Sequence, residues 1–216
     1  MTLSQRIVIA LIKSLARILV SWKVKGTENV PLNGPLIVIS NHVHAVDPIL
    51  LSVSFPRWIN FMAKRELFSR PFLSIILRWA RVFPVHRQGA RKGRREALEH
   101  AKEMLSQGSV LGMFPEGKRN REGKLLTGKA GAAVIAAKMD IPLLPVGITG
   151  TDKLKGISWL WKRPKIVINI GQPFKLPSTD GRLSRSQMKL LTDFMMGEIA
   201  ALLPWENRGG YQDHGD

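Results

Sequence analysis

Short apolar runs alternate with longer amphipathic segments along most of this chain, and this alternation restricts the fold more than any other feature. The short runs are predicted strands, at residues 36–40, 59–63, 82–85, 109–114, 143–148 and 166–170. The longer segments are predicted helices, at residues 48–55, 71–80, 91–107, 128–139 and 185–203. Strands that alternate with helices form βαβ units, so we predict an α/β protein with a largely parallel central sheet flanked by helices.

The first helix is predicted over residues 3–22 and is amphipathic. Its apolar side chains are interrupted by three cations, Arg6, Lys13 and Arg17, which lie within about 40° of one another around the helix. This pattern is typical of a helix that lies in a membrane interface, with its cations at the lipid headgroups. Packing of the helix against the domain is the alternative. No apolar run reaches the roughly 18 residues that a membrane-spanning helix needs.

The length of 216 residues suits one α/β domain with short extensions. We divide the chain into an N-terminal membrane-associating helix at residues 1–25, a main domain at 26–205 and a tail at 206–216. The tail is polar and contains glycine, so we expect it to be frayed.

The chain is strongly basic, with 33 Lys and Arg against 16 Asp and Glu and a net charge of +17. Such a charge attracts nucleic acid, an anionic membrane surface or phosphorylated substrates. A basic nucleic-acid-binding module is therefore an alternative class, although aromatic residues make up only 7% and no nucleic-acid fold signature is present. The absence of cysteine excludes disulfides, thiolate metal sites and a cysteine nucleophile.

The loop after the predicted strand 36–40 contains a histidine and an aspartate five positions apart, His42 and Asp47. At this spacing the two side chains diverge on a helix and lie on opposite faces of a strand, so they meet only where the chain turns. Asp47 would then accept a hydrogen bond from one ring nitrogen of His42 and leave the other nitrogen free as a base. The alternatives are that Asp47 caps a helix starting at Pro48, that His42 is structural, and that His44 competes for Asp47.

A second motif follows the predicted strand 109–114. Residues 112–118 read G-x-x-x-x-G-K, which is a P-loop apart from Arg119, where a P-loop has Ser or Thr. The missing hydroxyl is the magnesium ligand, and Glu116 would repel a phosphate group inside the cradle. We therefore exclude nucleotide hydrolysis.

Four blocks, taken in order, resemble those of the glycerolipid acyltransferase family, which includes the 1-acylglycerol-3-phosphate (PlsC-like) acyltransferases. The blocks are Asn41-His42 with Asp47, which matches H-x4-D; 82–87, which ends in Arg87; 114–119, which matches F-P-E-G-T-R; and 141–146, a Pro-containing strand. Residues 63–68 resemble a further family stretch. Together the similar blocks cover residues 25–150. The main departure is Lys118, which stands where the family usually has threonine and adds a positive charge.

The resemblance implies transfer of a fatty acyl group from a thioester, acyl-CoA or acyl carrier protein, to the free hydroxyl of 1-acylglycerol-3-phosphate, giving phosphatidic acid. Glycerol-3-phosphate or another lysophospholipid is the alternative acceptor. His42 would be the catalytic base, with Asp47 holding its ring. No G-x-S-x-G motif and no cysteine are present, so we expect direct transfer without a covalent acyl-enzyme. We expect no metal and no cofactor beyond the donor as co-substrate.

The resemblance also implies the substrate-binding residues. Arg87 and Arg119 would hold the acceptor phosphate, with Lys64 as a weaker candidate. Glu116, next to Gly117, would hold the acceptor glycerol or orient Arg119, and a structural ion pair with Arg119 is the alternative. The expected partners are a phospholipid membrane, a lysophospholipid and the acyl donor, with no nucleic acid. The expected location is the cytoplasmic face of the cell membrane, as a peripheral or monotopic protein.

Overall fold

The computed structural model describes residues 3–79, 82–85, 91–156, 158–177 and 183–212. Within these residues seven strands form one sheet, in the order β1-β7-β6-β2-β5-β3-β4. The strands are β1 Ser21–Lys25, β2 Leu36–Ser40, β3 Ile59–Lys64, β4 Phe83–Val85, β5 Val110–Met113, β6 Leu143–Thr149 and β7 Lys165–Ile170. The helices are α1 Leu3–Leu19, α2 Asp47–Ser54, α3 Pro71–Trp79, α4 Arg91–Ser106, α5 Gly131–Met139, α6 Trp159–Lys162 and α7 Arg185–Ala201. The predicted α/β class is confirmed.

The sheet is mostly parallel, as predicted. β2 pairs in parallel with β5 and β6, and β3 pairs in parallel with β4 and β5. β7 is antiparallel to β6, and β1 runs parallel to β7. The carboxyl ends of the five strands β2 to β6 therefore lie at one edge of the sheet, which is where α/β proteins commonly place their ligand sites.

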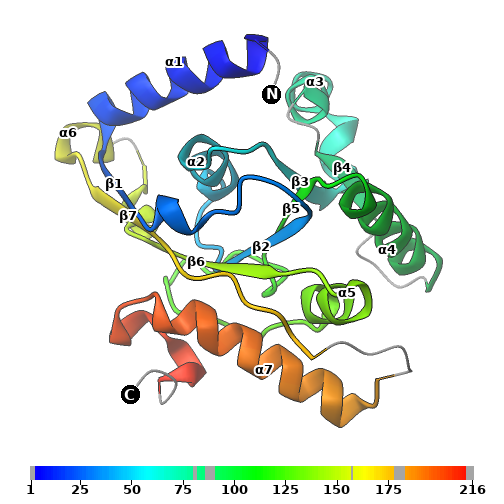
Figure 1. Ribbon diagram of the computed structural model, residues 1–216. Helices are drawn as coiled ribbons and strands as arrows, with labels where there is room; N and C mark the ends of the chain where they lie inside the picture. Colours follow the sequence, from blue (N-terminus) through cyan, green and yellow to red (C-terminus); the bar gives the residue numbers. More distant parts are fainter. Residues whose placement is uncertain (1–2, 80–81, 86–90, 157, 178–182, 213–216) are drawn as a thin grey trace.

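Helices cover both faces of the sheet and create two apolar cores. In Figure 1, α1, α2 and α3 lie above the sheet, and α5 and α7 lie below it. Val38 and Leu51 belong to the upper core, whereas Ile39 and Met196 belong to the lower one. Successive residues of one strand thus enter opposite cores, and this explains why the strand sequences are apolar throughout.

The N-terminal segment differs from the prediction of one helix over residues 3–22. α1 ends at Leu19, and the next residues form β1, an edge strand of the sheet. Trp22 and Val24 pack against the upper core while their neighbours along the strand are exposed, an alternation that belongs to a strand rather than a helix. No helix in the described part of the chain is long and apolar enough to cross a bilayer.

The C-terminal segment was expected to fray, and this expectation is wrong for the residues described. Two short 3-10 turns, Trp205–Asn207 and Gly209–Tyr211, follow α7. Tyr211 is buried in the lower core. The amide N–H of Leu125 donates to the carbonyl of Asn207 at 2.8 Å, so the segment is tied to the loop after β5.

Candidate active site

Two loops meet at the carboxyl edge of the sheet, because β2 and β5 are neighbours. Residues 41–46 follow β2 and residues 114–130 follow β5. The second loop holds both main-chain polar groups of His42. Its amide N–H donates to Glu116 Oε1 at 2.8 Å, and its carbonyl accepts from Asn120 N at 2.8 Å.

The side chains of His42 and Asp47 are in contact. His42 Nδ1 lies 2.9 Å from Asp47 Oδ2, and the same oxygen accepts the amide N–H groups of Val43 and His44, each at 2.7 Å. The Asp47 side chain is completely buried, whereas that of His42 is 17% exposed. A carboxylate that accepts from Nδ1–H leaves Nε2 with a free lone pair. The arrangement can therefore act as an oriented base.

The alternatives for this loop are resolved by the same contacts. α2 does begin at Asp47 with a proline in its first turn, but the N-cap residue is Val46, so Asp47 does not cap the helix. The His44 ring does not bind Asp47; its Nδ1 accepts from Val46 N at 3.5 Å. His42 is the imidazole that Asp47 holds.

The His42 ring packs on a row of aromatic side chains. Phe114 stacks on it with ring centroids 4.1 Å apart and an interplanar angle of 20°, and Phe61 stacks on Phe114 with centroids 5.8 Å apart. This row requires a glycine in β5, since a Cβ at Gly112 would lie 2.3 Å from Phe61 Cε1. The glycine that matches the start of a P-loop is therefore a buried strand position, and no helix follows Lys118 until α5.

Asn41 fixes the residue before His42 to the neighbouring strand. Its side-chain Nδ2 donates to the carbonyl of Ile148 at 2.8 Å, and its Oδ1 accepts from Ile148 N at 2.8 Å. Ile148 lies in β6, on the opposite side of β2 from β5. The His42 loop is thus tied to β6 on one side and to the loop after β5 on the other.

Glu116 is buried and connects two loops through their main chains. Besides His42 N, its carboxylate binds Leu126 N, which donates to Oε2 at 3.0 Å. Burial raises the pKa of Glu116 to about 7; Asp47 adds to this, while the two backbone hydrogen bonds and Lys118 oppose it. The alternative of an ion pair with Arg119 is wrong for this structure, because no such pair forms between these two described side chains. Contact of Glu116 with the acceptor glycerol stays a prediction.

The rest of the F-P-E-G block carries exposed positive charge. Lys118 and Arg119 are exposed, and Gly117 adopts a left-handed conformation with φ +70°. Arg119 lies close enough to affect the His42 loop. Burial lowers the pKa of His44, and the charges of Arg119 and Arg121 lower it further, against the opposite effect of Asp47. Asn120 N donates to the carbonyl of His42, so Arg119, the residue before Asn120, lies next to the His42 loop.

Two of the predicted phosphate-binding residues are not placed by the structure. Arg87 lies outside the described residues, two positions after the end of β4 at Val85. Lys64 is the last residue of β3, at the same sheet edge as His42, and its side chain is outside what the structure describes. Their contact with an acceptor phosphate stays a prediction.

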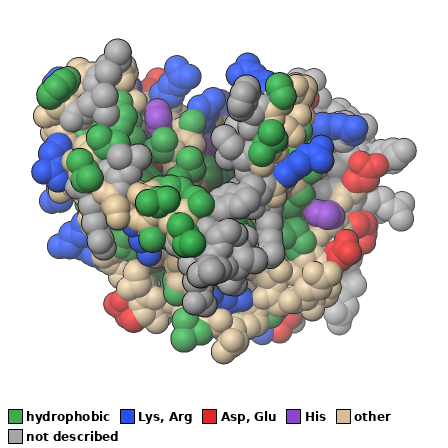
Figure 2. Space-filling model, turned by 90° about the horizontal axis from the view of Figure 1, so that it is seen from above, with side chains coloured by type: hydrophobic (Ala, Val, Ile, Leu, Met, Phe, Trp, Pro, Cys, Tyr) green, Lys and Arg blue, Asp and Glu red, His purple; other side chains and the backbone are tan. Residues whose placement is uncertain are grey.

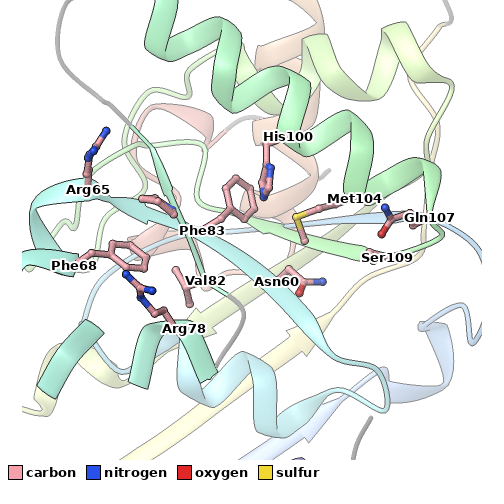
Figure 3. A pocket seen from close by; sticks show the side chains of 11 residues that line it. Asn60, Arg65, Phe68, Arg78, Val82, Phe83, His100, Met104, Gln107 and Ser109 are labelled. Atoms are coloured by element: carbon pink, nitrogen blue, oxygen red, sulfur yellow. The ribbon is translucent and has the colours of Figure 1, made fainter. Parts of the chain in front are cut away.

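A cavity of about 760 Å³ lies beside the edge strand β4 and is separate from the His–Asp pair. Figure 3 shows His100 and Met104 on one side of Phe83, with Phe68 and Arg78 close together on the other side. Neither His42 nor Asp47 lines it.

The upper face of the molecule carries exposed apolar side chains. They are Ile7 (53% exposed), Leu11 (63%) and Ile18 (68%) in α1, Ile49 (48%) in α2, Ile75 (68%) in α3 and Trp161 (90%) in α6. In Figure 2, which looks onto the molecule from this side, hydrophobic side chains alternate with Lys and Arg side chains. The three α1 residues lie four and seven positions apart, so they share one side of the helix.

Sequence reasoning assigned no role to three residues that shape this site: Asn41, Phe114 and Leu126. The first two stand inside matched blocks, Asn41 directly before His42 and Phe114 as the first residue of the F-P-E-G block, so their position is a usable signal. The Leu126 contact involves only its backbone amide, and a backbone contact leaves no trace in residue type.

Comparisons with known proteins find relatives in sequence and in fold. The model of the acyltransferase family matches residues 21–149. A 1-acyl-sn-glycerol-3-phosphate acyltransferase of Borreliella burgdorferi is 33% identical over 60% of this chain and 51% of its own length, so the chain spans about half of that relative. The enzyme of the same name from Bacillus subtilis is 29% identical over 83% of this chain and 87% of its own length.

A solved structure is similar over most of the fold. It is the crystal structure of the 1-acyl-sn-glycerophosphate acyltransferase PlsC from Thermotoga maritima, which matches with a TM-score of 0.63 and 28% identity. The match covers 90% of this chain and 79% of the other.

Proposed function

Because this chain belongs to the acyltransferase family, we propose that it transfers a fatty acyl group to the free hydroxyl of 1-acylglycerol-3-phosphate and produces phosphatidic acid. The observation that carries the proposal is the 2.9 Å contact between His42 Nδ1 and the buried Asp47 carboxylate. The names of the Borreliella and Bacillus relatives support this acceptor.

The chemistry follows from the free nitrogen of His42. A hydroxyl is a weak nucleophile at neutral pH, so a base that removes its proton during attack accelerates the reaction by roughly 10²–10⁴-fold. Nε2 takes the hydroxyl proton while the oxygen bonds to the thioester carbonyl carbon, and the carbon–sulfur bond breaks. The imidazolium then returns the proton to the departing thiolate. Asp47 stabilises the imidazolium through Nδ1–H.

The positive charge around this pair suits an acceptor that carries a phosphate. Arg119 is exposed beside the His42 loop, and an arginine can bind two phosphate oxygens at once. Arg87 and Lys64 are the further phosphate ligands in this proposal, and Glu116 with Gly117 shapes the turn that presents Arg119. The donor is a thioester, either acyl-CoA or acyl carrier protein, and the reaction needs neither metal nor cofactor.

The upper face supports a membrane location for the enzyme. Apolar side chains of a helix that are 53–68% exposed gain free energy when they enter the acyl region of a bilayer. Each cation near an anionic leaflet adds about 1 kcal/mol. In this proposal the protein is peripheral or monotopic on the cytoplasmic face, where lysophospholipid and donor meet.

The test is an acylation assay with the purified full chain. Lysophosphatidate is offered with acyl-CoA and, separately, with acyl-acyl carrier protein, in the presence and absence of a metal chelator. We expect phosphatidic acid from at least one donor, with chelator present, and loss of at least 10²-fold in kcat for His42→Ala.

The matched control is His100→Ala, which removes an exposed imidazole from α4. This variant should keep its activity. Near-normal turnover by His42→Ala, or no product from either donor with the wild-type chain, would refute the proposal.

A further inference from the structure

The C-terminal turns reach the His42 loop through a chain of hydrogen bonds that starts at Asn207. The carbonyl of Asn207 accepts from Leu125 N at 2.8 Å, and its side-chain Nδ2 donates to the carbonyl of Gly123 at 2.9 Å. Asn207, a single residue in the C-terminal turns, therefore holds two main-chain groups of the loop after β5. This loop segment, residues 123–128, has no regular secondary structure of its own, so its position depends on such contacts.

Packing holds the same segment in place from both sides. A Cβ on Gly209 would lie 2.1 Å from the carbonyl oxygen of Leu125, so only a glycine fits where the chain passes this loop. On the other side, a Cβ on Gly128 would lie 2.5 Å from Met196 of α7. Leu125 and Tyr211 are both buried in the lower core. Residues 204–211 and 123–128 thus form one packed unit.

Two paths of hydrogen bonds connect this unit to the main-chain N–H and carbonyl of His42. Along one path, Leu126 N binds Glu116 Oε2 at 3.0 Å and Glu116 Oε1 accepts from His42 N at 2.8 Å. Along the other, Gly123 N donates to the carbonyl of Asn120 at 3.1 Å, and Asn120 N donates to the carbonyl of His42 at 2.8 Å.

From this geometry we propose that Asn207 is a positioning residue of the active site, which holds the base His42 through Gly123–Asn120 and through Leu125–Leu126–Glu116. The proposal adds to the proposed function, on which its catalytic consequence rests. It assigns a role to residues 204–211, which lie outside the part of the chain that matches the acyltransferase family model.

A shift of a base by a fraction of an ångström lowers the rate of proton transfer without changing how substrates bind. Asn207 touches neither the His–Asp pair nor the exposed arginines. We therefore expect Asn207→Ala to lower kcat by about three- to tenfold, the effect of one lost hydrogen bond. The KM values for acceptor and donor should stay unchanged.

The main experiment is hydrogen–deuterium exchange of full-length Asn207→Ala, read at the peptide that covers residues 40–47, together with steady-state kinetics. We expect about fivefold faster exchange at 40–47 and at 120–126, with exchange in β6 and α7 unchanged. Gly209→Ala is the second variant, because its Cβ would displace Leu125 directly. The control is Glu206→Ala, an exposed residue in the same turn, which should leave exchange and kcat as in the wild type.

Unchanged exchange at 40–47 in both Asn207→Ala and Gly209→Ala would overturn the proposal. So would faster exchange spread evenly over the whole chain, because this indicates general destabilisation. The wild-type chain could form no phosphatidic acid while exchange at 40–47 still responds as expected. Asn207 would then position the His42 loop as proposed, and the proposed function would be the part that fails.

Discussion

The His42 loop and the upper face, formed by α1, α2 and α3, differ in how firmly their side chains are held. In the loop, the main-chain groups of His42, the side chain of Asn41 and both oxygens of Glu116 have partners between 2.8 and 3.0 Å away. On the face, Leu11 is 63% exposed and Ile75 68% exposed. The first region holds atoms in fixed positions, as a proton transfer requires. The second leaves apolar surface open, as contact with lipid requires.

This comparison predicts two separable kinds of defect. Substitutions in the loop should reduce turnover of a short-chain, water-soluble acceptor and leave vesicle binding unchanged. Substitutions on the face should weaken vesicle binding and leave turnover of the soluble acceptor unchanged.

The largest effect is expected for Asp47→Asn. The amide oxygen still accepts hydrogen bonds from the loop, but the negative charge that stabilises the His42 imidazolium is lost. We expect kcat on the soluble acceptor to fall by about 10²–10⁴-fold. Circular dichroism should show an intact fold, and sedimentation with anionic vesicles should be unchanged. A fall in vesicle binding as large as the fall in kcat would show that the two regions are not independent.

The next effect concerns the pH dependence of stability at Glu116. Its pKa is raised by burial from an ordinary 4.5 to about 7, so the folded state takes up a proton that the unfolded state lacks between these values. The contribution of Glu116 to stability is therefore fully present at low pH and is lost as pH rises through about 7. The size of the change is at most about 3 kcal/mol.

Glu116→Gln isolates this contribution, because the amide does not titrate. The pKa of His44 is lowered, so its contribution to the stability of the fold has the opposite pH dependence and is lost as pH falls. This contribution is the same in both proteins and cancels in the comparison. We expect the difference in unfolding free energy between wild type and Glu116→Gln, from urea titrations at pH 5 to 8, to decrease between pH 5 and about 7 and to level off above it. A difference that does not vary with pH would mean that Glu116 keeps an ordinary pKa.

The contrast between the two regions also explains what the sequence could predict. The approach of His42 to Asp47 follows from a spacing that requires a turn, so local geometry was sufficient. The contact of Asn41 with Ile148 spans 107 positions, and that of His42 with Glu116 spans 74. These contacts depend on β2 lying between β6 and β5, and hydrophobic periodicity does not determine strand order.

The two errors in the fold have local causes. Trp22 continues the apolar stripe of α1, so the prediction extends this helix to residue 22, although residues 21–25 alternate as in a strand. Residues 205–211 are mostly polar, yet Asn207 uses its polarity to bind the loop after β5, and one apolar side chain, Tyr211, enters the core. A polar composition is the same for a frayed surface tail and for a segment that is hydrogen-bonded to the domain, so composition alone does not distinguish them.

A smaller effect is expected for Gly112→Ala, which tests the aromatic row beneath His42. The added methyl group would lie 2.3 Å from Phe61 Cε1 and 2.7 Å from Ile59 Cγ2, so Phe61 must move. Overpacking of this kind costs about 1–3 kcal/mol of stability, measured by thermal or urea unfolding. Phe114 stacks on both Phe61 and His42, so a displaced Phe61 would also shift the His42 ring. We therefore expect a lower kcat even at temperatures where the protein stays folded. Gly108→Ala is the control, since its Cβ would meet no atom within 4 Å although its φ of +74° adds some backbone strain.

The smallest effect is expected on the apolar face, where no single side chain decides the outcome. Leu11→Gln removes one apolar group from the exposed side of α1, and we expect about fivefold weaker binding to anionic vesicles, the effect of roughly 1 kcal/mol of lost burial. Its matched control is Leu190→Gln in α7, a leucine that is 71% exposed on the opposite side of the sheet. Equal losses in both variants would indicate general surface hydrophobicity, whereas a loss for Leu11 alone places the lipid contact on the side of the molecule where α1 lies.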